Sequence, residues 1–317
     1  MREATRAGDT YDVRPGHPGL RPVEKNVSTE QRTEESQKAN RRLVEFLRHP
    51  GYEVIPLEGT EESVVEHVPK DIALTVTASP GKGTWATLDL AERLAGHGFG
   101  VAPHLSARLI RDRTELSEIL QRLREAGIRD AFVVAGDVDE PAGEFEGAAG
   151  LLLAMSEIGH DLDGVGITGY PESHPKISDE MTIRAMFEKA PYATYIISQI
   201  CFDPGVTSEW ARQVWLRGVK LPIRVGMPGY VNRQKLMRIS ASIGLGDSAR
   251  FLKRQRNWLL KLLLPGGYSP GRLIEGLKPG FADPESNIRG LHIYTFNEVQ
   301  ETEAWRRKML ERAETSA

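Results

Sequence analysis

Eight short runs of apolar residues, rich in β-branched side chains, recur along the chain, and helical patterns lie between most of them. This alternation predicts strands connected by helices, the arrangement that forms a parallel sheet. Eight strands favour an α/β sheet closed into a (β/α)8 TIM barrel over an open sheet. The expected strands are Tyr52–Pro56, Asp71–Thr77, Gly100–His104, Ala131–Ala135, Gly164–Thr168, Tyr195–Ile200, Pro222–Met227 and Leu291–Thr295.

Two regions depart from this repeat. Residues 1–27 contain prolines and glycines among scattered charges, which predicts an extended or disordered arm. Ser28 and Gln31 form a capping box that predicts the start of a helix, so residues 28–317 are expected to be a single barrel domain. Within residues 246–289, a helix over Ser248–Leu264 and a loop are expected before the last strand.

Composition excludes several classes of protein. The chain has 41 lysines and arginines against 44 acidic residues, which gives a net charge of −3. It therefore lacks the basic excess that is typical of proteins that bind nucleic acid. The single cysteine, Cys201, excludes an intrachain disulfide and a multi-cysteine zinc site, and we expect no bound metal. No apolar run reaches the roughly 18 residues of a membrane span, and the N-terminal residues lack the apolar segment of a secretory signal. We therefore expect a cytoplasmic protein with no membrane partner.

Three local patterns resemble known motifs without their context. GVGITG at Gly164–Gly169 lies inside an expected strand, whereas a dinucleotide-binding fingerprint precedes a helix. In GYSPG at Gly267–Gly271, Pro270 follows the serine and has no N–H to offer an oxyanion. In SPGKGT at Ser79–Thr84, Gly83 separates the lysine from the threonine that a P-loop requires next to it. None of the three is interpreted as a functional motif.

The ends of the expected strands carry a series of more specific motifs. In chain order they are YEVIPL at Tyr52–Leu57, APHLSA at Ala102–Ala107, AGD at Ala135–Asp137, GYPESHP at Gly169–Pro175, IISQICFD at Ile196–Asp203, LPIRVGMPG at Leu221–Gly229 and LHIYTFN at Leu291–Asn297. Together they resemble, in the same order, the motifs of the methylenetetrahydrofolate reductase family. The resemblance implies a barrel enzyme of one-carbon metabolism that reduces 5,10-methylenetetrahydrofolate to 5-methyltetrahydrofolate with NADH or NADPH through FAD, a step that serves methionine biosynthesis.

The resemblance also implies roles for particular residues. Glu53 is expected to be the general acid that helps to open the methylene bridge, which requires a pKa raised by its apolar strand. Asp137 is expected to lie beside flavin and pterin with a catalytic role, while Gln199 and Tyr230 are expected to bind the folate. Flavin contacts are implied at Thr77, His104, Gly136, Asp137, Tyr170, His174 and, allowing a one-residue gap, Lys189.

Departures from the family pattern leave alternatives open. The arginine of the family's RGD motif is replaced by Ala135 here, and the tyrosine after the second-strand threonine is replaced by Ala78. The arginine that closes the last-strand motif is replaced by Glu298. These losses predict weak FAD binding or a flavin-independent reaction with NADH. A barrel that binds folate without redox chemistry, or passes one-carbon units to a partner, is the alternative from another class, and a barrel lyase with coincidental matches is a third. The choice between NADH and NADPH stays open, as does the oligomeric state, a homo-oligomer included.

Overall fold

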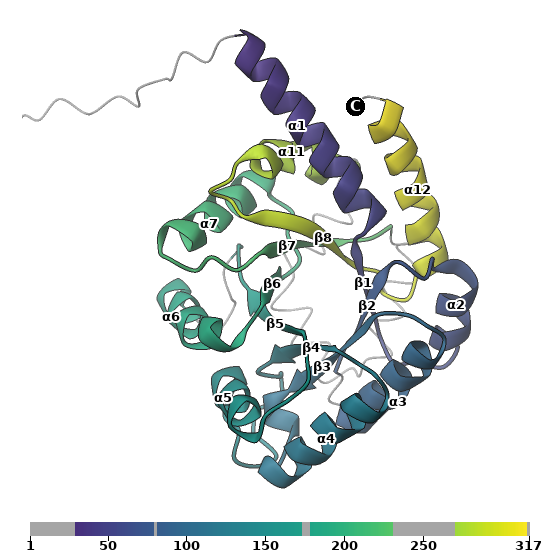
Figure 1. Ribbon diagram of the computed structural model, residues 1–317, viewed down its shortest axis with the longest axis vertical. Coiled ribbons are helices and arrows are strands. Elements are labelled where there is room, and N and C mark those ends of the chain that lie inside the picture. Colours follow the sequence, from purple (N-terminus) through teal and green to yellow (C-terminus); the bar gives the residue numbers. More distant parts are fainter. Residues whose placement is uncertain (1–28, 79–80, 173–177, 231–269, 316–317) are drawn as a thin grey trace, which may run out of the picture.

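Eight parallel strands close into a barrel in the computed structural model, which describes residues 29–78, 81–172, 178–230 and 270–315 (Figure 1). Each strand pairs with the next along the chain, and the last pairs with the first, which confirms the (β/α)8 barrel expected from the sequence. The strands are β1 (Gly51–Val54), β2 (Ala73–Val76), β3 (Val101–Ser106), β4 (Asp130–Val134), β5 (Gly164–Gly169), β6 (Tyr195–Ser198), β7 (Ile223–Pro228) and β8 (Ile288–Tyr294).

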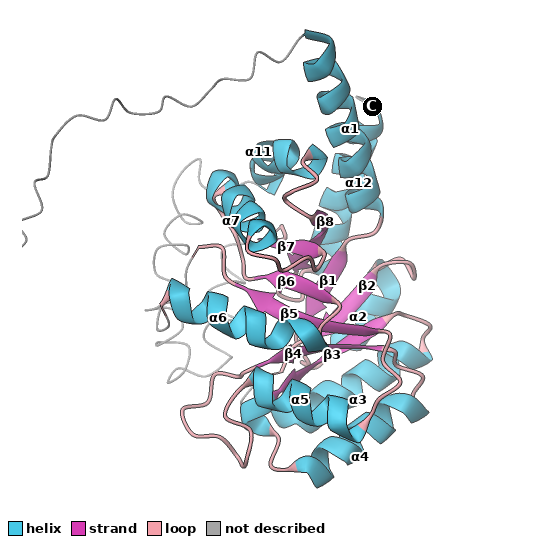
Figure 2. Ribbon diagram, turned by 60° about the vertical axis from the view of Figure 1, so that its left-hand side comes forward, coloured by secondary structure: helices cyan, strands magenta, loops and turns pink. Residues whose placement is uncertain are grey.

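Helices surround the barrel and run from the carboxyl end of one strand towards the amino end of the next (Figure 2). Asp112 caps one of them by accepting a hydrogen bond from the Glu115 amide at 2.9 Å, as its sequence pattern predicts. The described helices are α1 (Thr29–Arg48), α2 (Thr60–His67), α3 (Gly83–Gly96), α4 (Arg113–Glu125), α5 (Ala148–Ile158), α6 (Asp179–Lys189), α7 (Pro204–Leu216), α11 (Pro270–Ala282) and α12 (Val299–Thr315).

The segment before the last strand corrects one expectation. The sequence pattern predicts a loop there, but residues 270–282 form α11. Leu273, Ile274, Leu277 and Phe281 are buried along one side of this helix, which packs against α1 and α7. Because glycines and prolines interrupt the apolar pattern, the local signal for a helix is weak, and tertiary packing decides the structure. The helix expected over 248–264 and the arm at 1–27 lie outside the described residues.

Helix α1 is anchored to the barrel by a buried polar network. The hydroxyl of Tyr52 donates to Glu303 of α12 at 2.9 Å. Arg306 forms an ion pair with Glu303 at 2.7 Å and donates to the carbonyl of Leu47, also at 2.7 Å, near the end of α1. Since burying unpaired charges is costly, the mutual pairing allows this network to connect α1, β1 and α12.

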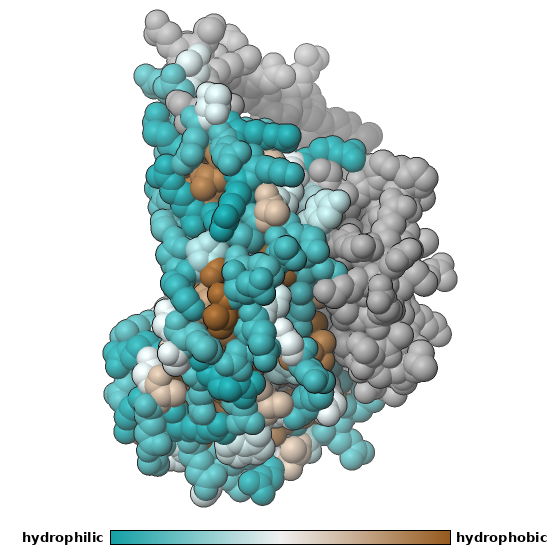
Figure 3. Space-filling model, turned by 90° about the vertical axis from the view of Figure 1, so that its right-hand side faces the viewer, coloured by the Kyte–Doolittle hydropathy of each residue, from teal (hydrophilic) through white to brown (hydrophobic). Residues whose placement is uncertain are grey.

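The outer surface is polar where the helices meet solvent. The face on the right of Figure 1 shows apolar residues only in small, separate areas (Figure 3). No helix in the described part of the chain has the length and apolar character required to cross a membrane. Nor do the described residues gather three or more histidine, cysteine, aspartate or glutamate side chains in a group able to hold a metal ion.

Side chains alternate between the two faces of the barrel wall, and this alternation positions the candidate site. In β1, Tyr52 and Val54 belong to the apolar layer between barrel and helices. Glu53, which lies between them, points into the barrel. It is in register with Thr75 of β2 and Tyr294 of β8. Apolar side chains fill another part of the interior, where Phe132, Tyr195 and Ile197 form a small cluster of their own.

Candidate active site

Glu53 stands between two histidines inside the barrel. Its Oε2 atom lies 3.5 Å from Nε2 of His104 on β3 and 3.4 Å from Nε2 of His292 on β8. The Glu53 side chain is 14% exposed, and those of His104 and His292 are 8% and 1% exposed. Three strands thus bring three titratable groups to one buried point.

Burial decides the protonation of all three groups. Loss of solvent raises the pKa of Glu53 to about 7, against a smaller lowering by His104. Burial lowers the pKa of His104 to about 4 and that of His292 to about 3. At slightly acid to neutral pH, Glu53 therefore carries its proton between two neutral imidazoles. A carboxylic acid in this state can donate a proton to a bound substrate.

The end of β8 fixes the backbone around Glu53. Thr295 donates its hydroxyl to the carbonyl of Glu53 at 2.6 Å. Asn297, which has a positive φ of 60°, accepts from the amide of Ile55 at 2.8 Å and donates to its carbonyl at 3.0 Å. These contacts explain the asparagine of the LHIYTFN motif, since asparagine tolerates the left-handed conformation better than most residues.

His292, Tyr294, Thr295 and Asn297 are site residues that the sequence analysis did not name individually. Their signal was present, because LHIYTFN was recognised as a strand-end motif. Alternation along that strand places His292 and Tyr294 on the same face as Glu53.

Tyr170 and Asp137 lie on the same side of the barrel as Glu53. Burial and the nearby carboxylate of Asp137 raise the pKa of Tyr170. Burial raises the pKa of Tyr294 well above its ordinary value, with further contributions from Glu53 and Tyr170. These electrostatic influences connect Glu53, Tyr294, Tyr170 and Asp137 in a series, so the first, fourth, fifth and eighth strands contribute to one site.

Two further predicted residues, Thr77 and Gly136, lie just after strands that contribute to this site. Thr77 is half-buried directly after β2, and its amide donates to the carbonyl of Val54 at 2.9 Å. Gly136 has a φ of 98° and lies so close to Ser106 that a Cβ would collide with the serine hydroxyl. The glycine therefore permits both the left-handed turn and the close approach that place Asp137.

Gln199 and Glu172 belong to adjacent loops. Gln199 is exposed directly after β6, and its amide donates to the carbonyl of Gly169 at 2.8 Å. The carboxylate of Glu172 accepts from the amides of Phe202 and Asp203 at 2.5 and 2.7 Å. The glutamate of the GYPESHP motif thus holds the loop that follows Gln199, a positioning role that the sequence analysis missed.

Three other predicted residues are not joined to this group. His174 lies outside the described residues. Tyr230 is 54% exposed after β7. Lys189 is the last residue of α6, where the chain turns back towards the start of β6, and burial lowers its pKa to about 8. Within the described part of the chain we find no contact between Lys189 and the Glu53 group.

The residues at these strand ends fit an FAD only in part. Nε2 of His104 and the hydroxyl of Ser106 are buried without a hydrogen-bond partner in the described residues, so polar groups are available to a flavin ring. The pyrophosphate would need a cation, and position 135 is alanine. The nearby Arg108 already donates to three loop carbonyls, and Arg184 pairs with Glu188. The described arginines at these strand ends do not provide the anchor for a pyrophosphate.

Comparison with known proteins identifies the family. Residues 61–245 match the family model described as methylenetetrahydrofolate reductase. This chain belongs to the methylenetetrahydrofolate reductase family. A 5,10-methylenetetrahydrofolate reductase of Pectobacterium carotovorum subsp. carotovorum is 31% identical over 177 residues, which cover 54% of this chain and 58% of the relative. The chain therefore spans little more than half the length of that curated reductase. The family match begins after Glu53 and ends before His292, so the geometry around these residues is an independent observation.

Solved structures resemble the chain only distantly. A putative lyase/mutase and a putative phosphonomutase, both from Burkholderia cenocepacia J2315, are 13% and 11% identical, each with a TM-score of 0.46. Each alignment covers 88% of this chain, and they cover 86% and 99% of the two solved chains. At this identity and score the two likenesses carry no information about function.

Proposed function

We propose that this protein reduces 5,10-methylenetetrahydrofolate to 5-methyltetrahydrofolate, with a nicotinamide dinucleotide as the source of hydride. The observation that carries the proposal is the carboxyl of Glu53, buried inside the barrel between two histidines, where loss of solvent raises its pKa to about 7. Membership of the reductase family supports the same substrate and reaction class.

The proposed reaction needs one proton and one hydride. The methylene group bridges two nitrogens of the folate, and hydride adds readily only when one carbon–nitrogen bond has opened to an iminium. Glu53 donates its proton to the departing nitrogen, and the hydride then adds to the methylene carbon to form the methyl group. A buried acid that is still protonated near neutral pH suits the first step.

Polar residues at the other strand ends orient the folate in this proposal. The pterin presents an amide-like edge of donors and acceptors, which a carboxamide and a carboxylate can match with paired hydrogen bonds. Gln199 and Asp137 are both exposed at strand ends on the Glu53 side, and Tyr230 is exposed after the seventh strand. We assign pterin binding to the first two and a folate contact to Tyr230.

The route of the hydride depends on whether a cation is available for the pyrophosphate, and the described residues at these strand ends do not supply one. FAD, when bound, would accept hydride from the nicotinamide and pass it to the folate. Because Ala135 and the occupied Arg108 leave the pyrophosphate without an arginine among the described residues at these strand ends, we propose that FAD binds weakly or that hydride passes directly from NADH.

An anaerobic incubation tests this function. Purified protein, NADH and methylenetetrahydrofolate should yield 5-methyltetrahydrofolate, measured by chromatography, and parallel samples with and without added FAD separate the two hydride routes. NADPH replaces NADH in a third sample. Folate binding with no oxidation of nicotinamide under any of these conditions would overturn the reductase and indicate a non-redox folate-binding barrel.

A further inference from the structure

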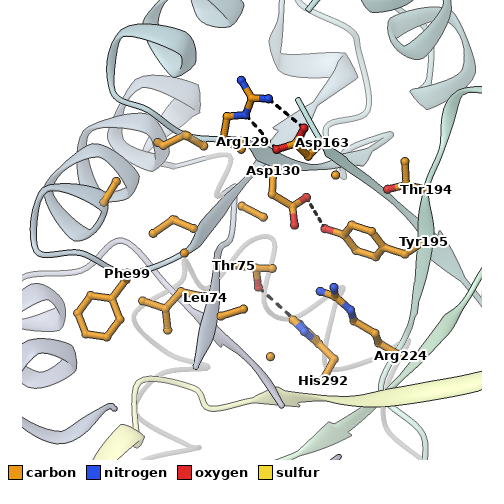
Figure 4. Close-up of a pocket in the computed structure, with 18 of the residues that line it drawn as sticks. Leu74, Thr75, Phe99, Arg129, Asp130, Asp163, Thr194, Tyr195, Arg224 and His292 are labelled. Carbon is orange, nitrogen blue, oxygen red and sulfur yellow. Dashed lines mark hydrogen bonds and ion pairs between the residues drawn. The ribbon is translucent and has the colours of Figure 1, made fainter. Parts of the chain in front are cut away.

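A second opening lies at the opposite end of the barrel. A cavity of about 570 Å³ is bounded by residues at the amino ends of the strands (Figure 4). Gly51, Ala73, Asp130, Gly164 and Tyr195 are first residues of their strands and line it. The predicted substrate residues Asp137 and Gln199 instead follow carboxyl ends. The cavity is therefore separate from the folate side.

Small residues leave this end of the barrel hollow. TIM barrels usually fill their interior with bulky branched side chains. Here a Cβ on Gly51 would lie 2.9 Å from Nδ1 of His292, and one on Gly164 would lie 2.6 Å from the carboxyl of Asp130. The two glycines thus make room for polar side chains where apolar packing is usual.

Polar side chains form part of a cavity wall that is otherwise apolar, and the rim of the cavity reaches solvent. Tyr195 donates its hydroxyl to Asp130 at 2.8 Å, and the guanidinium of Arg224 lies 4.3 Å from the centre of the Tyr195 ring. At the rim, Arg129 and Asp163 form an ion pair at 2.9 Å, and both side chains are more than half exposed. The volume accommodates several water molecules, and the polar groups of the wall can hold them by hydrogen bonds.

His292 connects this cavity with Glu53. It lines the cavity beside Thr75, and the two side chains point toward each other with 3.5 Å between Nε2 and the threonine hydroxyl (Figure 4). The same Nε2 lies 3.4 Å from Oε2 of Glu53. The other ring nitrogen, Nδ1, is buried against Gly51 of the cavity wall and has no hydrogen-bond partner in the described residues.

We infer that this cavity is the access route for the proton that Glu53 must regain after each turnover, with His292 passing the proton on. The inference rests on the proposed function, in which Glu53 loses its proton to the folate. Substrates then cover the carboxyl ends of the strands, whereas the amino ends stay open to water. A route through the barrel can restore the acid from that free side.

The proton transfer balances through the two ring nitrogens. The route requires a cavity water to reach Nδ1 of His292, which Gly51 covers in the resting structure. That water gives a proton to Nδ1 while the Nε2 proton passes to the Glu53 carboxylate. The resulting hydroxide is neutralised from solvent along the water chain. Nδ1 then returns its proton to the cavity water. The Thr75 hydroxyl gives a proton to Nε2 and regains one from water, which restores the starting tautomer of His292.

Burial and one neighbouring charge keep His292 in its neutral relay form. Burial and the positive charge of Arg224 hold its pKa at about 3, so the imidazole does not store a proton. Other titratable groups near it are Glu53 and His104 within the barrel and Tyr294, whose ring centre lies 5.1 Å away. Asp130, Tyr195, Arg129 and Asp163 line the same cavity. A neutral imidazole is both donor and acceptor, as a relay requires.

A rapid-mixing experiment on the full chain tests the route. At about pH 6, below the raised pKa of Glu53, most of the resting protein holds the proton, so the first turnover of His292→Gln draws on a stored proton and later turnovers do not. Later turnovers should therefore be slower than the first by at least about tenfold, which gives a burst approaching one equivalent of 5-methyltetrahydrofolate, whereas wild type should show no such difference. Ala73→Leu, which narrows the cavity at the first residue of β2, should give the same burst. Ala304→Leu, on the exposed side of α12, is the control and should behave as wild type.

The outcomes separate this route from the proposed function. Equal slowing of first and later turnovers in His292→Gln would show a structural role and overturn the relay, as would unchanged steady-state rates in both cavity variants. If His292→Gln does not fold, Ala73→Leu alone decides. Full activity of Glu53→Gln would instead overturn the acid role of Glu53, on which the relay depends.

Discussion

Oε2 of Glu53 and Nε2 of His104 lie 3.5 Å apart, across one intervening strand, yet burial reverses their usual order of ionisation. The pKa of the carboxyl rises to about 7 and that of the imidazole falls to about 4, so between these values both groups are neutral. In water, a carboxyl and an imidazole would both be charged near pH 5 to 6. The barrel thus keeps a proton on the carboxyl without a charged partner to hold it.

Replacement of this acid should remove folate reduction selectively. We expect Glu53→Gln to reduce the rate of 5-methyltetrahydrofolate formation by about 10²–10⁴-fold, since the amide cannot donate the required proton. Oxidation of NADH with an artificial acceptor, or folate binding if no flavin is present, should persist because neither needs the acid. Glu62→Gln, on the exposed surface of α2, is the control. Equal loss of both activities would indicate a structural role for Glu53.

The same substitution should change how stability depends on pH. The unfolded chain ionises Glu53 near 4.5 and the folded chain near 7, so the neutral carboxyl contributes stability below pH 4.5 that is lost as the pH rises through 7. We expect Glu53→Gln to gain stability relative to wild type from pH 5 to pH 8, up to about 3 kcal/mol. His104 and His292 have lowered pKa values, so their contribution to stability is instead lost as the pH falls. Both histidines are present in wild type and variant, so this contribution does not enter the difference between the two proteins. Chemical denaturation at several pH values measures the difference, and a constant difference would contradict the raised pKa.

Arg108 should position the loop that carries Asp137. Its guanidinium donates to the carbonyls of Val138, Asp139 and Glu146 at 2.9, 2.6 and 2.9 Å. We expect Arg108→Ala to lower kcat/KM for the folate by about tenfold, mainly through KM, because loss of these hydrogen bonds frees the loop.

Arg113→Ala offers a matched control, since it breaks an exposed ion pair with Glu157 at 2.5 Å. Such exposed pairs contribute little to stability. Hydrogen exchange at residues 137–146 should rise in Arg108→Ala alone. Unchanged exchange and activity would show that the loop does not depend on Arg108.

The sequence predicted the barrel because each strand carries its own local signal. Runs such as Tyr195–Ile200 combine β-branched residues with a clear end, and the observed strands lie within a few residues of the expected ones. Helix α11 was missed because glycines and a proline weaken its apolar pattern, although packing against α1 and α7 is enough to form it.

The candidate site was predictable where a motif ends a strand, and less so where groups meet across the barrel. Glu53 and Asp137 were named from their motifs. The approach of His292 to Glu53 depends on the closure of β8 onto β1, which joins residues 239 positions apart. The cavity at the amino ends of the strands depends on glycines from several strands. No local sequence pattern predicts that these glycines come together.

Restoring the family's arginine after the fourth strand should strengthen FAD binding. Ala135 is exposed, so a longer side chain fits there without loss of packing, and its carbonyl still accepts from the Arg108 amide at 2.9 Å. An arginine offers a forked set of donors and a permanent charge that suit a phosphate or a flavin carbonyl. One such charge-assisted hydrogen bond contributes about 1.5–3 kcal/mol, so we expect Ala135→Arg to lower the dissociation constant of FAD about ten- to hundredfold.

Fluorescence titration with FAD compares wild type, Ala135→Arg and the control Ala142→Arg, which adds the same charge at another exposed position in the loop. An equal gain in the control would show that general charge, rather than the position after β4, is responsible. Stoichiometric flavin retained by the wild type through dialysis would show that other residues already anchor the cofactor. Tighter binding in Ala135→Arg alone would mean that this site keeps the geometry for a flavin and lacks chiefly the cation for its pyrophosphate.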